Sequence, residues 1–173
     1  MPEKFSEKSF FAEKLEDCKT FSQIFSLVKE AVENHLEKSR TGLMLGISNL
    51  GGSSSFFIGA YYAVDSNIIV LNEFPLKVIN EKNPELMKPY VFQVLLHEYL
   101  HSLDYLDEAT VRKLTYIICE KFFGKGHIVS KLVKDISAFL PQLAYPNFGW
   151  FPEKEAEIYV VEDFDMENLS YVS

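Results

Sequence analysis

Residues 94–104, with the sequence Val-Leu-Leu-His-Glu-Tyr-Leu-His-Ser-Leu-Asp, place two of the chain's four histidines four positions apart in an otherwise apolar run. Each residue of an α-helix advances by about 100°, so His97 and His101 lie about 40° apart on one face, one turn above the other. Two imidazoles in this arrangement can bind one ion. The opposite side of the helix is strongly apolar and would anchor it in the core. The stretch therefore predicts a core helix that carries a metal site.

The rest of the composition is typical of a folded protein of modest size. The chain has 173 residues, 47% of them apolar and 14% aromatic, which is enough to bury a core without disulfides. We expect one domain over residues 1–173. Cys18 and Cys119 form no closely spaced pair, and we expect both to be reduced.

The charge and the apolar runs argue against two classes of partner. A formal net charge of -8 without a basic cluster excludes nucleic acid as the expected partner. No apolar run approaches the roughly 18 residues of a membrane-spanning helix. The N-terminal residues carry charges of both signs and do not resemble a secretory signal. These features predict a cytoplasmic protein that binds no membrane.

Strand-forming sequences precede the histidine-rich helix. Residues 56–64 and 68–71 are rich in β-branched and aromatic side chains and are joined by Asp65-Ser66-Asn67, which favours a hairpin. Shorter strands are expected at residues 43–47 and 158–161.

Helical periodicity predicts four helices. The first covers Thr20–Ser39, with Thr20 and Gln23 as a capping box and Gly42 as its stop. The other three are expected from Pro84 or Pro89 to about Leu103, from Asp107 to Phe123 with Gly124 to Gly126 as its stop, and from His127 to Leu140.

The order His97-Glu98-x-x-His101 is the HExxH pattern of zinc metallopeptidases. Neutral imidazoles suit Zn²⁺, which in catalytic sites takes three protein ligands and a water. Glu98 flanks the histidine face, where its carboxylate can take a proton from that water. The pattern predicts one zinc ion held by His97 and His101, with Glu98 as general base.

The third zinc ligand is predicted from a resemblance. Residues 97–107 resemble the metzincin pattern HExxHxxGxxH/D in its aspartate variant, and this resemblance implies Asp107 as the third ligand. The family glycine, which takes a left-handed turn, is replaced by Asp104, a residue type that tolerates positive φ. If the helix instead continues, Asp104 or Glu108 would follow His101 on the same face.

Other interpretations of these residues stay open. Asp107 is also a good N-cap for the helix that follows it. His127 is either a third ligand, a donor to the reaction oxyanion or a plain helix-terminal histidine. Tyr105 lies near enough in sequence to donate to a transition state.

A broader resemblance covers residues 40–127. The run Arg40–Gly46, the hairpin ending at Ser66–Asn72 and the HEYLH helix resemble a family of small archaeal proteins described as minimal zincin-like metallopeptidases. The resemblance implies an α+β fold in which a small mixed sheet with a hairpin packs against the active-site helix.

The function expected from these features is hydrolysis of a peptide or protein substrate by a zinc-dependent peptidase. The outer strand of the hairpin could bind the peptide as an added strand. The alternatives are a zinc protein without peptidase activity and a zinc hydrolase of a small non-peptide amide. The sequence carries no prediction of the oligomeric state.

Overall fold

The computed structural model describes residues 7–52, 57–139, 143–144, 157–162 and 164. Its helices are α1 (Glu7–Asp17), α2 (Phe21–Leu36), α3 (Glu73–Lys82), the 3₁₀ turn η1 (Pro84–Leu86), α4 (Met87–Ser102), α5 (Glu108–Phe123), α6 (Ile128–Lys134) and α7 (Ile136–Phe139). Its strands are β1 (Met44–Ser48), β2 (Phe57–Ile58), β3 (Ala60–Tyr62), β4 (Ile68–Asn72), β5 (Leu143–Ala144) and β6 (Ile158–Val161).

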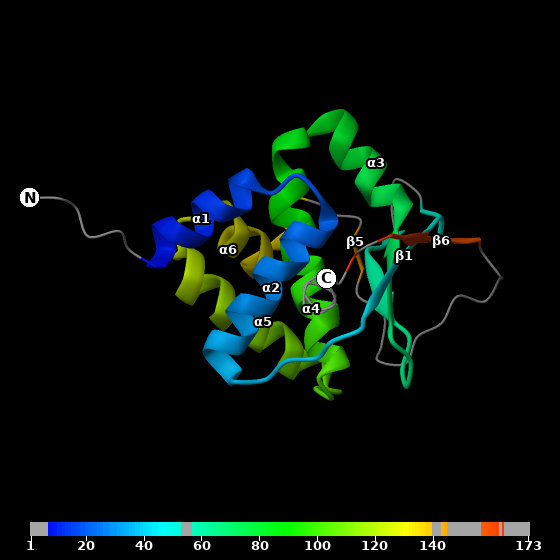
Figure 1. The fold of residues 1–173 in the computed structure, drawn as a ribbon. Helices are drawn as coiled ribbons and strands as arrows, with labels where there is room; N and C mark the ends of the chain where they lie inside the picture. The colour runs from blue at the N-terminus through cyan, green and yellow to red at the C-terminus, as the bar shows by residue number, and fades with distance from the viewer. Residues whose placement is uncertain (1–6, 53–56, 140–142, 145–156, 163, 165–173) are drawn as a thin grey trace, which may run out of the picture.

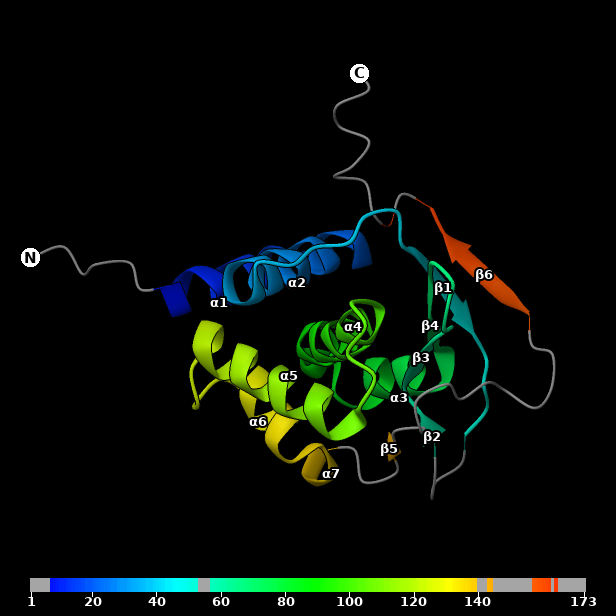
Figure 2. The same cartoon turned by 90° about the horizontal axis from the view of Figure 1, so that it is seen from below.

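Helix α4, which carries the HExxH pattern, lies at the centre of the fold. All of its residues from Pro89 to Ser102 are buried. Figure 2 shows α4 nearly end-on, with α1 and α2 on one side, α5 and α6 on another and the sheet on a third. A helix buried all round has no face left for water, so it must be enclosed by other elements.

A mixed four-stranded sheet flanks α4 (Figure 1). Its strand order is β3-β4-β1-β6, with β1 parallel to β4 and the other two pairs antiparallel. Strand β3 is at the edge and packs on α4. The predicted α+β class, the hairpin and the late strand at Ile158–Val161 are therefore confirmed.

The first strand of the hairpin is shorter than the sequence predicts. The chain breaks at Gly59 into β2 and β3, and β2 pairs in parallel with β5 instead of continuing the hairpin. Only β3 forms the antiparallel hairpin with β4.

The ends of the helices follow local chemistry that the sequence partly reveals. Helix α2 begins after Thr20, whose hydroxyl accepts from the Gln23 N–H as predicted. The predicted stop at Gly42 is wrong, because the helix already ends at Leu36 and Glu37 takes the left-handed conformation. Helix α5 ends at Gly124 as predicted.

One predicted helix is divided in the structure, and two helices were not predicted. The helix expected over residues 127–140 is interrupted at Asp135, where the backbone leaves the helical region. Helices α1 and α3 were not predicted. No helix within the described residues is long and apolar enough to cross a bilayer.

Arg40 connects the C-terminal end of α4 to the hairpin. Its guanidinium donates to the Ser102 carbonyl at 3.0 Å, to the Tyr62 hydroxyl at 2.8 Å and to the Ser66 carbonyl at 2.6 Å. Its own backbone N–H donates to the Tyr99 hydroxyl at 2.9 Å. These bonds fix the end of α4 that carries the histidines against the sheet.

Asn72, the last residue of β4, joins four segments through one buried side chain. Its Oδ1 accepts from the backbone N–H groups of Leu50 and Phe74, and its Nδ2 donates to the carbonyls of Gly51 and Ile58. This one side chain therefore provides hydrogen-bond partners for backbone groups of a loop, a strand end and the start of a helix.

Asn72→Ala should destabilise the protein by about 3 kcal/mol or more, because it leaves four partly buried backbone groups without this partner. The comparison is Asn67→Ala, which removes one exposed amide with a long 3.4 Å bond to the Gly42 carbonyl and should cost within about 0.5 kcal/mol. Urea denaturation measures both, and equal midpoints for the two variants would contradict the role given to Asn72.

Candidate metal centre

The two histidines of α4 lie on one face, as their spacing requires. Their ring centroids are 5.1 Å apart, and both side chains are buried. Buried imidazoles need polar partners, because an unpaired polar group in the interior costs free energy. The partners come from the segment that follows α4.

The chain reverses direction after α4 through a turn that includes Asp104 at φ 72°. The left-handed conformation expected at Asp104 is therefore present. The turn brings the Tyr105 carbonyl to 2.8 Å from His101 Nδ1. A proton on Nδ1 donates to this carbonyl, which leaves Nε2 of His101 facing the site.

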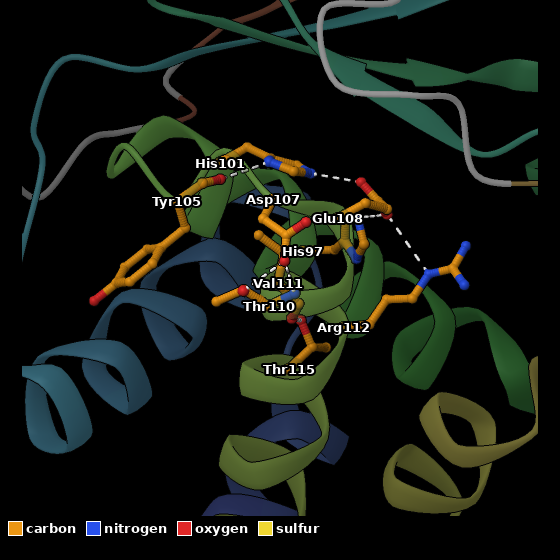
Figure 3. A network of polar contacts seen from close by, with 9 residues as sticks. All are labelled: His97, His101, Tyr105, Asp107, Glu108, Thr110, Val111, Arg112 and Thr115. Carbon is orange, nitrogen blue, oxygen red and sulfur yellow. Dashed lines mark hydrogen bonds and ion pairs between the residues drawn. The ribbon is translucent and has the colours of Figure 1, made fainter.

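Glu108, the first residue of α5, completes the cluster (Figure 3). Its Oε1 lies 2.7 Å from His97 Nε2, and its Oε2 lies 3.0 Å from His101 Nε2. Within the described residues, these three side chains form the one group of histidine, cysteine or carboxylate ligands that could hold a metal ion.

The spacing of the three ligands fits a metal ion. One ligand atom from each residue lies within 4.8 Å of the others. Ligand atoms about 2.0–2.1 Å from a tetrahedral zinc ion are separated by about 3.3 Å. The observed contacts of 2.7 and 3.0 Å, each to a different oxygen of Glu108, are within about 0.6 Å of this separation.

The carboxylate of Glu108 is held ionised. Burial would raise its pKa, but contacts with His101 and His97 outweigh burial and lower the pKa to about 2. Its Oε1 is buried and accepts no well-aligned hydrogen bond from the described residues, because the contact with His97 lacks that geometry. A cation would satisfy this oxygen.

Glu98 lies beside the cluster and is buried. Burial raises the pKa of its carboxyl, and the neighbouring histidines partly offset this effect. The carboxylate also accepts a hydrogen bond from the backbone N–H of Tyr62 in β3. The edge strand of the sheet therefore contacts the buried carboxylate that lies beside the two histidines.

Asp107, expected as the third ligand, is not brought to the histidines. Its Oδ2 accepts from the backbone N–H of Thr110 at 2.9 Å and from the Thr110 hydroxyl at 2.6 Å. Asp107 is thus the N-cap of α5, and its side chain is directed away from the cluster (Figure 3). A carboxylate used as a cap cannot also reach the two Nε2 atoms, and the next residue along takes that place.

The other candidates also lie outside the cluster. His127 caps α6 by accepting from the Val129 N–H and contacts the ring of Phe123. The Tyr105 ring lies under the Lys38 ammonium, 4.6 Å from its centroid, and points away from the histidines in Figure 3. Asp104 forms part of the turn that follows α4.

Two features of the site were not predicted from the sequence. Arg112 lies one helical turn after Glu108, and its Nε is 3.7 Å from Glu108 Oε1, an i,i+4 pair that the spacing could have suggested. The bond from Tyr62 to Glu98 had no signal, because it joins a strand and a helix far apart in the sequence.

Comparisons of the chain with protein-family models, curated proteins and solved structures find no match.

Glu108→Gln should lower the affinity for divalent metal by about a hundredfold or more, because it removes the one anionic ligand while keeping the side-chain shape. Asp107→Ala should keep the metal and only weaken the start of α5. Equilibrium dialysis with Zn²⁺ measures both variants. If Asp107→Ala loses the metal and Glu108→Gln keeps it, the arrangement of the three ligands described here is wrong.

In the metal-free protein, the ion pair between Glu108 and His101 should stabilise the fold most at intermediate pH and less at both lower and higher pH. The lowered pKa of Glu108 gives stability that is present above its ordinary value of 4.5 and lost as pH falls toward about 2. Burial lowers the pKa of His101, but Glu108 and Glu98 raise it above 6.5 overall, so its contribution is present below 6.5 and lost at higher pH. In chelator, thermal denaturation of wild type and Glu108→Gln should therefore differ most between pH 4.5 and 6.5, and a constant difference across pH would refute the pair.

Proposed function

We propose that the protein is a zinc-dependent metallopeptidase in which His97, His101 and Glu108 hold the metal and Glu98 is the general base. The observation that carries this proposal is the convergence of two Nε2 atoms and one ionised carboxylate beside a second, buried carboxylate. Three metal ligands next to a separate acid–base group are the parts that metal-assisted hydrolysis needs.

The donor set favours zinc over the harder cations. Two imidazole nitrogens and one carboxylate match three-ligand zinc sites, whereas Mg²⁺ and Ca²⁺ prefer oxygen ligands throughout. When bound, zinc supplies a Lewis acid that activates water and polarises the scissile carbonyl. The Tyr105 carbonyl fixes the tautomer of His101 and so keeps its Nε2 available.

Glu98 supplies the proton transfers. Its carboxylate takes a proton from the attacking water and delivers it to the leaving amine. The Tyr62 N–H bond orients one side of this carboxylate. A raised pKa suits a group that must both accept and release a proton near neutral pH.

The sheet supplies a place for an extended peptide. Among the described residues, β3 has one strand neighbour, β4. The N–H of Ala63, the residue after β3, donates to the Ile68 carbonyl of β4. The preceding N–H, that of Tyr62, instead bonds Glu98. Because successive N–H groups of a strand point to opposite sides, the unpaired edge of β3 faces the candidate site. A peptide added to this edge would run past Glu98 and the histidines.

Glu98→Gln should retain about one zinc ion per chain and reduce cleavage of an unfolded protein substrate by about a hundredfold or more, because the shape stays and the base is lost. Glu33→Gln removes an exposed carboxylate from α2 and should change neither quantity. Elemental analysis gives the zinc content, and mass spectrometry of the products gives the cleavage rate.

Three results would count against this function. Equal cleavage by Glu98→Gln and wild type would exclude the base. A full zinc equivalent in the His97→Ala, His101→Ala double variant would exclude the site. Zinc without any cleavage in wild type would leave a metal-binding protein that is not a peptidase.

A further inference from the structure

A cavity of about 520 Å³ adjoins the candidate metal centre. Gln93 and His97, one turn apart on α4, line one wall, and the other walls come from α5, α6 and α7. The volume lies within the roughly 300–1,000 Å³ of pockets that bind small ligands. His97 is therefore both a candidate metal ligand and one of the residues that line the cavity.

The cavity is positively charged although the chain is acidic. Among the described residues that line it, Arg112 and Lys113 of α5 and Lys134 of α6 are cationic and Asp135 is the one carboxylate. The whole chain has a formal net charge of -8. The cations are thus gathered locally, and a cleft lined by one sign of charge attracts ligands of the opposite sign.

The two lysines of the cavity, Lys113 and Lys134, take no part in the ion pairs of the described residues. Asp135 accepts a hydrogen bond from the Ser137 hydroxyl at 2.7 Å. Arg112 contacts Glu108 at 3.7 Å and so stands between the metal ligands and the cavity.

We propose that this cavity is a substrate subsite that binds a carboxylate next to the scissile bond, with Lys113 and Lys134 as the residues that recognise it. The proposal rests on the proposed peptidase function, because it takes its substrate from that reaction. The carboxylate comes either from an aspartate or glutamate side chain or from the C-terminus of the peptide. Both would place an anion among the lysines while the adjoining peptide bond reaches the site beside His97.

The subsite is tested by binding, separately from turnover. Zinc-loaded Glu98→Gln protein is titrated calorimetrically with two five-residue peptides, both acetylated and amidated, that differ only in a central glutamate or glutamine. A third peptide has no acidic side chain and a free C-terminus. Either the glutamate peptide or the free C-terminus should bind about tenfold more tightly than the neutral peptide, a difference expected for two partly exposed ion pairs.

The Lys113→Gln, Lys134→Gln double change should abolish this preference. The matched control is Lys121→Gln with Lys131→Gln, which removes one lysine from α5 and one from α6 outside the cavity and should keep it. Preference for the glutamate peptide identifies a side-chain subsite, and preference for the free C-terminus identifies a terminal-carboxylate subsite. Equal binding of all three peptides, or a preference that survives the loss of Lys113 and Lys134, would overturn the proposal.

The outcome separates this proposal from the function on which it rests. Zinc binding and cleavage by wild type without any carboxylate preference would refute the subsite alone. A lysine-dependent preference in a protein that cleaves nothing would refute the peptidase and retain the anion site.

Discussion

The complete burial of α4 is the constraint on which the rest of the fold depends. A helix with no solvent-facing side needs neighbours all round it, and α2, α5, α6 and the edge of the sheet supply them. The same burial makes its polar residues costly unless each finds a partner. His97, Glu98 and His101 meet this demand through Glu108, the Tyr62 N–H and the Tyr105 carbonyl. The candidate site is therefore also the way in which the core accommodates its ionisable groups.

The corner between α4 and α5 sets the geometry of the site. Asp104 takes a left-handed conformation that ends one helix, and Asp107 caps the next. These two aspartates determine where α5 begins and hence which residue of its first turn faces the histidines. Arg40 holds the same end of α4 against the hairpin, so the sheet edge, Glu98 and the candidate ligands share one support.

Features governed by local chemistry could be predicted from the sequence. The histidine face of α4, the cap at Thr20, the stop at Gly124 and the hairpin all follow from spacing and residue type. The choice of Glu108 over Asp107 could not be predicted, because both stand at the start of α5 and only the phase of that helix decides which one turns inward. Helix α3 was not predicted, and its Pro75 lies in the first helical turn, where proline is tolerated. The cavity beside His97 is lined by residues of four helices, and no sequence pattern within any one helix predicts it.

The three candidate ligands all lie within residues 97–108, and this closeness affects more than the site. Closing so short a segment costs little chain entropy, because the cost of loop closure grows with the length of the loop. A metal ion bound there would hold one corner together and leave the distant contacts of the sheet to form by themselves. The unfolded chain also keeps these side chains near one another, so it would retain some affinity for the ion. Metal would then stabilise the native state by less than its native-state affinity implies, since binding to the unfolded state reduces the gain.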